Sequence, residues 1–135
     1  MRAACVSVAG AVVFCLSTAC GSSTPVSATP SITQNFSGTV QPGGSDTNNF
    51  TVTQYGEVDI TVTSLGPPAT IQEGLAIGSV VGGACSPGSV AQGPVNAATT
   101  PQFVNPLNAG AYCVTVYDIG NQAGPVQYAL TVLHP

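Results

Sequence analysis

Residues 57–63 read EVDITVT, an unbroken alternation of polar and branched apolar side chains. Successive side chains of a β-strand point to opposite faces, so Val58, Ile60 and Val62 would share one buried face. The same period of two recurs on both sides of this stretch, in runs around Phe36 and Val40, Phe50 and Val52, Leu75 and Ile77, Tyr112 to Val116, and Tyr128 to Val132. No window shows convincing helical spacing, which predicts an all-β domain.

Glycine and proline clusters separate the apolar runs, as turn residues do between short strands. They fall at residues 42–46, 56, 66–68, 82–83, 108–110 and 120–125. This spacing predicts roughly six to eight antiparallel strands, packed as a two-sheet β-sandwich with Greek-key connections. Residues 84–106 are the least regular segment and contain several prolines. We expect a long loop there, with one short edge strand near Pro101 to Val104.

The polar positions of the predicted strands are mostly threonine. Threonine is β-branched and uncharged, so it suits a strand and can face water without charge. We therefore expect a solvent-facing set formed by Thr51, Thr53, Thr61, Thr63, Thr115 and Thr131.

Charged residues make up 4% of the chain, and Arg2 is the only lysine or arginine. Nucleic acid is excluded as an expected partner, because neutralising phosphates requires clustered lysine and arginine side chains. A buried carboxylate must rely on backbone donors, water or a metal ion, since no side-chain cation follows Arg2 except a protonated His134. The acids concerned are Asp46, Glu57, Asp59, Glu73 and Asp118.

The chain begins with an apolar run, AACVSVAGAVVFCLSTA at residues 3–19, which is shorter than a confident membrane span. The small residues before Cys20 and the Gly-Ser-Ser after it resemble the processing site of bacterial lipoproteins, where the cysteine after the cut receives the lipid. The resemblance implies a signal peptide at residues 1–19, lipidation of Cys20 and attachment to a membrane. Ordinary cleavage with secretion and an uncleaved anchor are the alternatives. The composition of residues 20–33 predicts a flexible tether before the domain at 34–135.

Two further cysteines, Cys85 and Cys113, stand alone in the body of the chain. Because exported proteins preserve disulfides, we predict that they pair. Cys113 alternates with core-facing neighbours, so it would point away from the main core, where Cys85 could reach it. Such a bridge would cross-link the irregular segment of residues 84–106 to the rest of the domain. On the chain-entropy model it would stabilise the fold by roughly 3 to 4 kcal/mol. A metal site is the alternative, although no recognisable zinc spacing is present.

Three stretches resemble the bacterial pre-peptidase C-terminal domain: NFTVTQYGEVDITV at residues 49–62, LNAGAYCVTV at 107–116 and YALTV at 128–132. The resemblance covers residues 35–133 and implies a jelly-roll-like β-sandwich. It also implies a noncatalytic role, with binding of calcium or a polymeric substrate in some members. Members are attached to secreted enzymes, whereas no peptidase precedes the module in this sequence. We therefore expect a free-standing envelope module.

Calcium is the best site chemistry that the residues suggest, and no other cofactor is predicted. Glu57 and Asp59 would share the outer face of one strand, and Asp118 would lie in a loop with Asn121. The alternative is that these acids only solvate the surface, with Asp118 capping a turn. Catalysis is not expected, because no Gly-x-Ser-x-Gly motif is present and His134, near the end of the sequence, is expected to fray.

These features predict a noncatalytic cell-envelope lipoprotein module for binding or adhesion, whose partner is an envelope protein, a glycan or calcium. Tyr55 and Tyr117 would be the outward-facing platforms for a sugar, since the chain has no tryptophan. The alternative is a secreted accessory or inhibitor domain without a lipid anchor.

Overall fold

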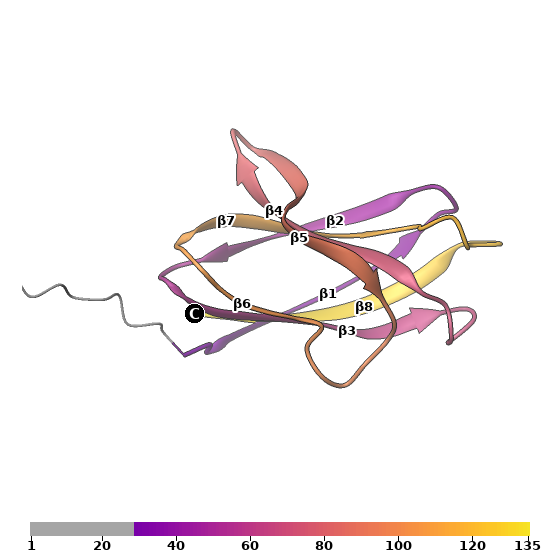
Figure 1. Cartoon of the computed structure of the whole chain (residues 1–135), viewed down its shortest axis with the longest axis horizontal. Helices are drawn as coiled ribbons and strands as arrows, with labels where there is room; N and C mark the ends of the chain where they lie inside the picture. The colour runs from indigo at the N-terminus through magenta and orange to yellow at the C-terminus, as the bar shows by residue number, and fades with distance from the viewer. Residues whose placement is uncertain (1–28) are drawn as a thin grey trace, which may run out of the picture.

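The computed structural model describes residues 29–135, which form eight β-strands and no helix (Figure 1). The strands are β1 (Ile32–Val40), β2 (Ser45–Val52), β3 (Gly56–Gly66), β4 (Glu73–Val81), β5 (Ala84–Val95), β6 (Phe103–Leu107), β7 (Gly110–Tyr117) and β8 (Val126–His134). They form two four-stranded antiparallel sheets, sheet A with the order β1-β8-β3-β6 and sheet B with the order β2-β7-β4-β5. The predicted all-β sandwich is confirmed.

The predicted signal peptide and Cys20 lie outside the described residues. Within residues 29–135, no helix is long and apolar enough to cross a membrane. Ile32 and Thr33, which the sequence assigns to the tether, belong to β1. The sandwich therefore begins slightly earlier than the expected boundary at residue 34.

The chain passes back and forth between the two sheets except at the β4–β5 hairpin, whose strands both lie in sheet B. Each sheet is consequently built from strands that are distant in sequence. The longest-range pairing joins β1 to β8, from Ile32 opposite His134 to Val40 opposite Val126. Eight strands in these two interleaved orders make a jelly roll, the sandwich built from two Greek keys. The jelly-roll-like architecture implied by the sequence is confirmed.

One hydrophobic core lies between the sheets, and it is made of the alternate side chains that the sequence pattern selects. Val58, Ile60 and Val62 of β3 have no exposed surface. They share one cluster with Val114 and Val116 of β7. Fully burying one such side chain stabilises a fold by about 1.5–3 kcal/mol, so this layer is the main source of stability.

The expectation of a long loop over residues 84–106 is wrong. Twelve of these residues form β5, and β6 begins at Phe103. Both are the outer strands of their sheets, where one row of backbone groups has no strand partner and a missing proline N–H costs little. Pro94 in β5 and Pro106 in β6 are tolerated for this reason. The expected edge strand near residues 101–104 corresponds to β6.

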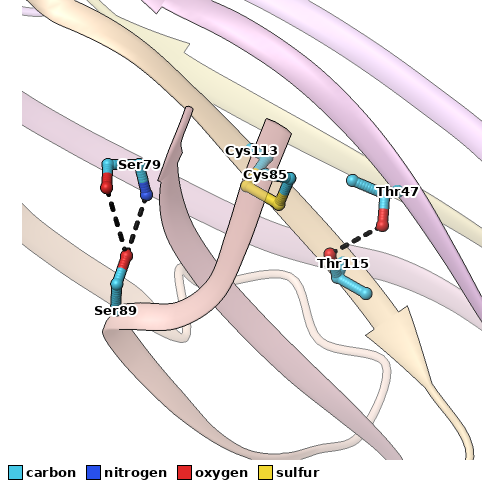
Figure 2. The surroundings of a disulfide bond; sticks show 6 residues. All are labelled: Thr47, Ser79, Cys85, Ser89, Cys113 and Thr115. Carbon is cyan, nitrogen blue, oxygen red and sulfur yellow. Dashed lines mark hydrogen bonds between the residues drawn. A yellow bond between two sulfur atoms is a disulfide. The ribbon is translucent and has the colours of Figure 1, made fainter. Parts of the chain in front are cut away.

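The expectation that Thr115 faces solvent is also wrong, since its side chain is 3% exposed. β7 is an inner strand of sheet B, and Thr115 lies between Thr47 of β2 and Ala76 of β4. Its hydroxyl is satisfied by a hydrogen bond of 2.8 Å with the hydroxyl of Thr47 (Figure 2). The other threonines of the predicted set remain exposed or half-buried.

Candidate functional site

A cavity of about 350 Å³ opens at the side of the sandwich where β5, the outer strand of sheet B, faces β6, the outer strand of sheet A. The loop of residues 96–102 joins these two strands (Figure 1). Its residues Asn96, Ala98 and Gln102 line part of the opening. The nonpolar part of the lining comes from Leu75, Ile77, Ala91, Gly93, Pro94, Val95, Ala98 and Phe103. Every side chain that lines the cavity is uncharged.

Small residues on the inner face of β5 create this cavity. Gly93 lies opposite Leu75, and Ala91 lies opposite Ile77. Directly opposed residues of an antiparallel pair point to the same face, and Leu75 and Ile77 point into the core. A Cβ atom on Gly93 would meet no atom within 4 Å. Gly93 therefore occupies a core-facing position with unfilled space beside it.

Hydrogen bonds to β3 hold the loop that forms the wall of the cavity. The Gln102 side chain accepts a hydrogen bond from the Val62 N–H at 2.8 Å and donates one to the Asn96 carbonyl at 2.8 Å. The backbone N–H groups of Ala98 and Gln102 donate to the carbonyls of Val62 and Ile60, each at 2.9 Å. The loop thus continues the edge of sheet A beyond β6. These contacts preform the cavity, as is usual for ligand pockets.

The disulfide predicted between Cys85 and Cys113 is confirmed, with the two Cα atoms 5.9 Å apart (Figure 2). Cys113 has no exposed surface and faces away from the core cluster, on the outer side of sheet B. Gly78 lies opposite Cys113, and a Cβ atom on Gly78 would collide with the Ser86 backbone. The bridge therefore holds the outer part of the β4–β5 hairpin against the outer face of sheet B.

The three calcium candidates do not meet at one place. Glu57 and Asp59 lie near the start of β3, where Asp59 is opposite Leu133 at the end of β8. Asp118 follows β7 at the other end of the sandwich, where its carboxylate accepts a hydrogen bond from Gly43 in the β1–β2 turn. Among the described residues, no group of three or more His, Cys, Asp and Glu side chains is placed to hold a metal ion. Glu57, Asp59 and Asp118 cannot form a single calcium site in this arrangement.

Asp118 serves as a cap for two loops. Its carboxylate accepts hydrogen bonds from the backbone N–H of Gly43 at 2.7 Å, of Gly120 at 2.7 Å and of Asn121 at 3.1 Å. These donors, with Gly43 first, lower the pKa of the Asp118 carboxyl despite an opposing effect of desolvation. Its oxygens are already occupied, which fits the turn-capping alternative.

Glu73 is a buried acid that the sequence analysis does not include among the candidate site residues, and it lies at the same end of the sandwich as Asp118. Glu73, the first residue of β4, has no exposed surface. One carboxyl oxygen accepts a hydrogen bond of 2.8 Å from the Gln122 side-chain amide, and the other has no partner. Burial raises the pKa of Glu73, and the nearby Asp118 charge acts in the same direction. The period of two through Leu75 and Ile77 would have placed Glu73 on the inner face.

A second polar group lies between β2 and β8. The Tyr128 hydroxyl donates to Asp46 at 2.9 Å and accepts from the Asn48 amide at 2.6 Å. A Cβ atom on Gly38 would collide with both the Asp46 carboxylate and the Tyr128 ring, so glycine makes room for this contact. Desolvation, reinforced by the hydrogen bond to Asp46, raises the pKa of Tyr128 to about 12.

The expectation that His134 frays is wrong. The Ser31 N–H donates to its carbonyl, and the residue lies opposite Ile32 in the β1–β8 pair. Its ring is 1% exposed and lies 5.8 Å from the ring of Phe50. Nδ1 contacts the Pro135 oxygen at 3.0 Å, whereas Nε2 has no hydrogen-bond partner in the described part of the chain. No hydroxyl or carboxylate side chain of residues 29–135 is hydrogen-bonded to this imidazole.

The two tyrosines considered as sugar platforms are half-buried. The ring of Tyr117 lies over Gly74, where a Cβ atom would overlap its carbon atoms. Part of that ring is therefore used in packing against β4 and is not free for stacking.

Neither a protein-family model nor a curated protein matches this chain. The resemblance to the bacterial pre-peptidase C-terminal domain stays a prediction from the sequence.

Proposed function

We propose that this chain is an exported, noncatalytic binding module of the bacterial cell envelope, tethered to a membrane by a lipid on Cys20. The disulfide between Cys85 and Cys113 is the observation that carries the proposal. Disulfides persist in oxidising compartments and are rare where glutathione and thioredoxin keep thiols reduced. A bridge whose Cys113 half is fully buried supports a structural role in an exported protein.

The distance of Glu57 and Asp59 from Asp118, together with the burial of His134, supports a binding role over catalysis. General acid–base chemistry needs such groups within hydrogen-bond reach of one shared substrate. Glu57 and Asp59 lie at one end of the sandwich and Asp118 at the other. His134 is buried, with no hydroxyl or carboxylate partner among the described residues. A secreted accessory domain, the alternative, would also be noncatalytic and would differ only in having no lipid anchor.

The low charge of the chain limits the chemical class of its partner. Arg2 is the only lysine or arginine in the sequence. A polyanion would find no lysine or arginine in residues 29–135 to neutralise it. An uncharged glycan or a protein surface of the envelope fits this composition better. We leave calcium out of the proposal, because its three candidate ligands do not converge.

Membrane partitioning in a bacterial host tests the anchor. We expect the wild type in the membrane fraction, with incorporation of labelled palmitate, and Cys20→Ser in the soluble exported fraction without label. Cys15→Ser, a cysteine change in the same apolar segment, is the matched control and should behave as the wild type. Wild-type protein recovered in the medium would favour the secreted alternative. Membrane retention of Cys20→Ser would favour an uncleaved anchor.

A further inference from the structure

The cavity between β5 and β6 has the properties of a ligand site. We propose that it binds a small, neutral, apolar molecule, an inference that rests on the proposed role as a binding module and deepens it. Three features of the cavity support this ligand: the glycine that leaves the space, the size of the space and the lack of charge on its walls.

Gly93 is not required by the backbone. Glycine is usually kept where φ is positive or where a neighbour comes too close for a Cβ atom. The φ of Gly93 is not in the positive range, and a Cβ atom there would meet no atom within 4 Å. Other glycines of the fold, such as Gly38 and Gly78, are crowded by neighbouring atoms. Gly93 instead leaves room at a core-facing position of a strand, where glycine weakens the strand and packs nothing.

The size of the cavity suits a compact organic molecule. Its volume of about 350 Å³ falls at the lower end of the range for ligand pockets, which is about 300–1,000 Å³. An engineered apolar cavity of about 150 Å³ binds benzene. The cavity here is therefore large enough for a molecule bigger than one aromatic ring. Leu75, Ile77 and Phe103 would supply the apolar contacts.

The walls select a neutral ligand. No charged side chain lines the cavity, and residues 29–135 contain no lysine or arginine to compensate an anion. Placing a charge in an apolar site without a partner is costly. Two polar side chains of the wall are already hydrogen-bonded: the Gln102 amide to the backbone of Val62 and Asn96, and the Asn96 amide to Gln72 and the Ile71 carbonyl. An aliphatic or aromatic molecule with at most a hydroxyl group matches these walls.

Dye titration of the exported protein tests the proposal, with Cys20→Ala in all samples so that no detergent is needed. N-phenyl-1-naphthylamine, a neutral fluorescent probe, should bind saturably, and 1-decanol should displace it better than decanoate does. Gly93→Leu places a side chain in the cavity and should weaken dye binding by about tenfold or more, while its Tm is unchanged or higher because an unfilled space is occupied.

Gly124→Leu is the matched control. It adds the same side chain at a glycine that also has no atom within 4 Å of a Cβ position, but it lies in the β7–β8 loop and not in the cavity lining. It should bind the dye as the parent protein does. If Gly93→Leu fails to fold, Ala98→Val narrows the cavity from the loop side and should weaken binding in the same direction.

Three results would overturn the proposal: no saturable binding, equal binding by the parent and the cavity-filling variant, or displacement by decanoate that matches or exceeds displacement by decanol. None of these bears on the lipid anchor, which the Cys20 partitioning experiment tests alone. If the dye experiment failed while the wild type still partitioned to the membrane, the chain would remain a binding module that contacts its partner through another surface.

Discussion

The Gln122 side-chain amide donates a hydrogen bond of 2.8 Å to the carboxyl of Glu73, a group with no exposed surface and no cationic partner in the described chain. Burial raises the pKa of this carboxyl, so the folded state holds the proton more tightly than the unfolded chain does. A neutral carboxyl provides an O–H donor that a carboxylate lacks, and the Gln122 carbonyl oxygen is itself a buried acceptor without a partner.

The first prediction concerns the pH dependence that follows from Glu73. The stabilisation of the folded state that comes from the raised Glu73 pKa is fully present below the unfolded pKa of 4.5. It is lost as pH rises through the raised folded pKa. Glu73→Gln keeps an acceptor for Gln122 and removes the titration. We expect the variant to resemble the wild type near pH 4 and to become relatively more stable as pH rises. Urea unfolding across pH 4–8 measures this, with exposed Glu57→Gln as the control, and a constant difference at all pH values would contradict it.

The second prediction concerns Asp118, whose pKa is shifted in the opposite direction to that of Glu73. Backbone donors, led by the Gly43 N–H, lower the pKa of this carboxyl, so its stabilisation is present above the unfolded pKa of 3.8 and is lost as pH falls through the lowered value. Asp118→Asn should lower Tm at pH 7 and have a smaller effect in strong acid. Thermal unfolding at the two pH values measures the change. Equal losses at both would count against a role for the charge.

A third prediction concerns the ionisation of Tyr128. Its pKa of about 12 means that the folded state keeps the hydroxyl protonated after an ordinary tyrosine has ionised. The associated stability is present below the unfolded pKa of 10 and is lost as pH rises toward 12. Ultraviolet titration should show a late tyrosine ionisation that is absent in Tyr128→Phe. A late tyrosine that persists in this variant would assign the shift to another residue.

The fourth prediction is a double-mutant comparison at the disulfide. Cys85→Ser, Cys113→Ser and the double variant should each lose about the same free energy of unfolding, because each removes the same cross-link. The chain-entropy model gives about 3 to 4 kcal/mol for a loop of this length. Denaturant unfolding under oxidising conditions measures the three values. Additive losses would mean that the two sulfurs stabilise the fold independently.

Much of the fold is predictable because one physical signal dominates it. The alternation through Val58, Ile60 and Val62 marks a half-buried strand, and the same period identifies the other core strands. β5 escapes this signal because it is an outer strand, where glycine and proline are tolerated and one face carries little apolar content. Prolines in an outer strand therefore do not indicate a loop.

The cavity and the buried acid depend on contacts that the sequence does not display. The space beside Gly93 exists only because β5 pairs with β4 in a register that brings Gly93 opposite Leu75. The period of two does place Glu73 on the inner face, but its partner Gln122 comes from a distant loop. The cysteine pair is predictable because two isolated thiols in a small domain that the sequence predicts to be exported have few uses other than a disulfide.

The oxidation state of Cys85 and Cys113 in protein taken directly from living cells tests the central claim most directly. Free thiols would be trapped by an alkylating reagent at lysis, and the peptides would then be identified by mass spectrometry without reduction. If the sandwich is exported and its Cys85–Cys113 disulfide forms, mass spectrometry should find one pair of peptides joined through these two sulfurs and no alkylation of either cysteine. Both cysteines alkylated in the folded, mature protein would contradict export to an oxidising compartment and the role assigned to the bridge.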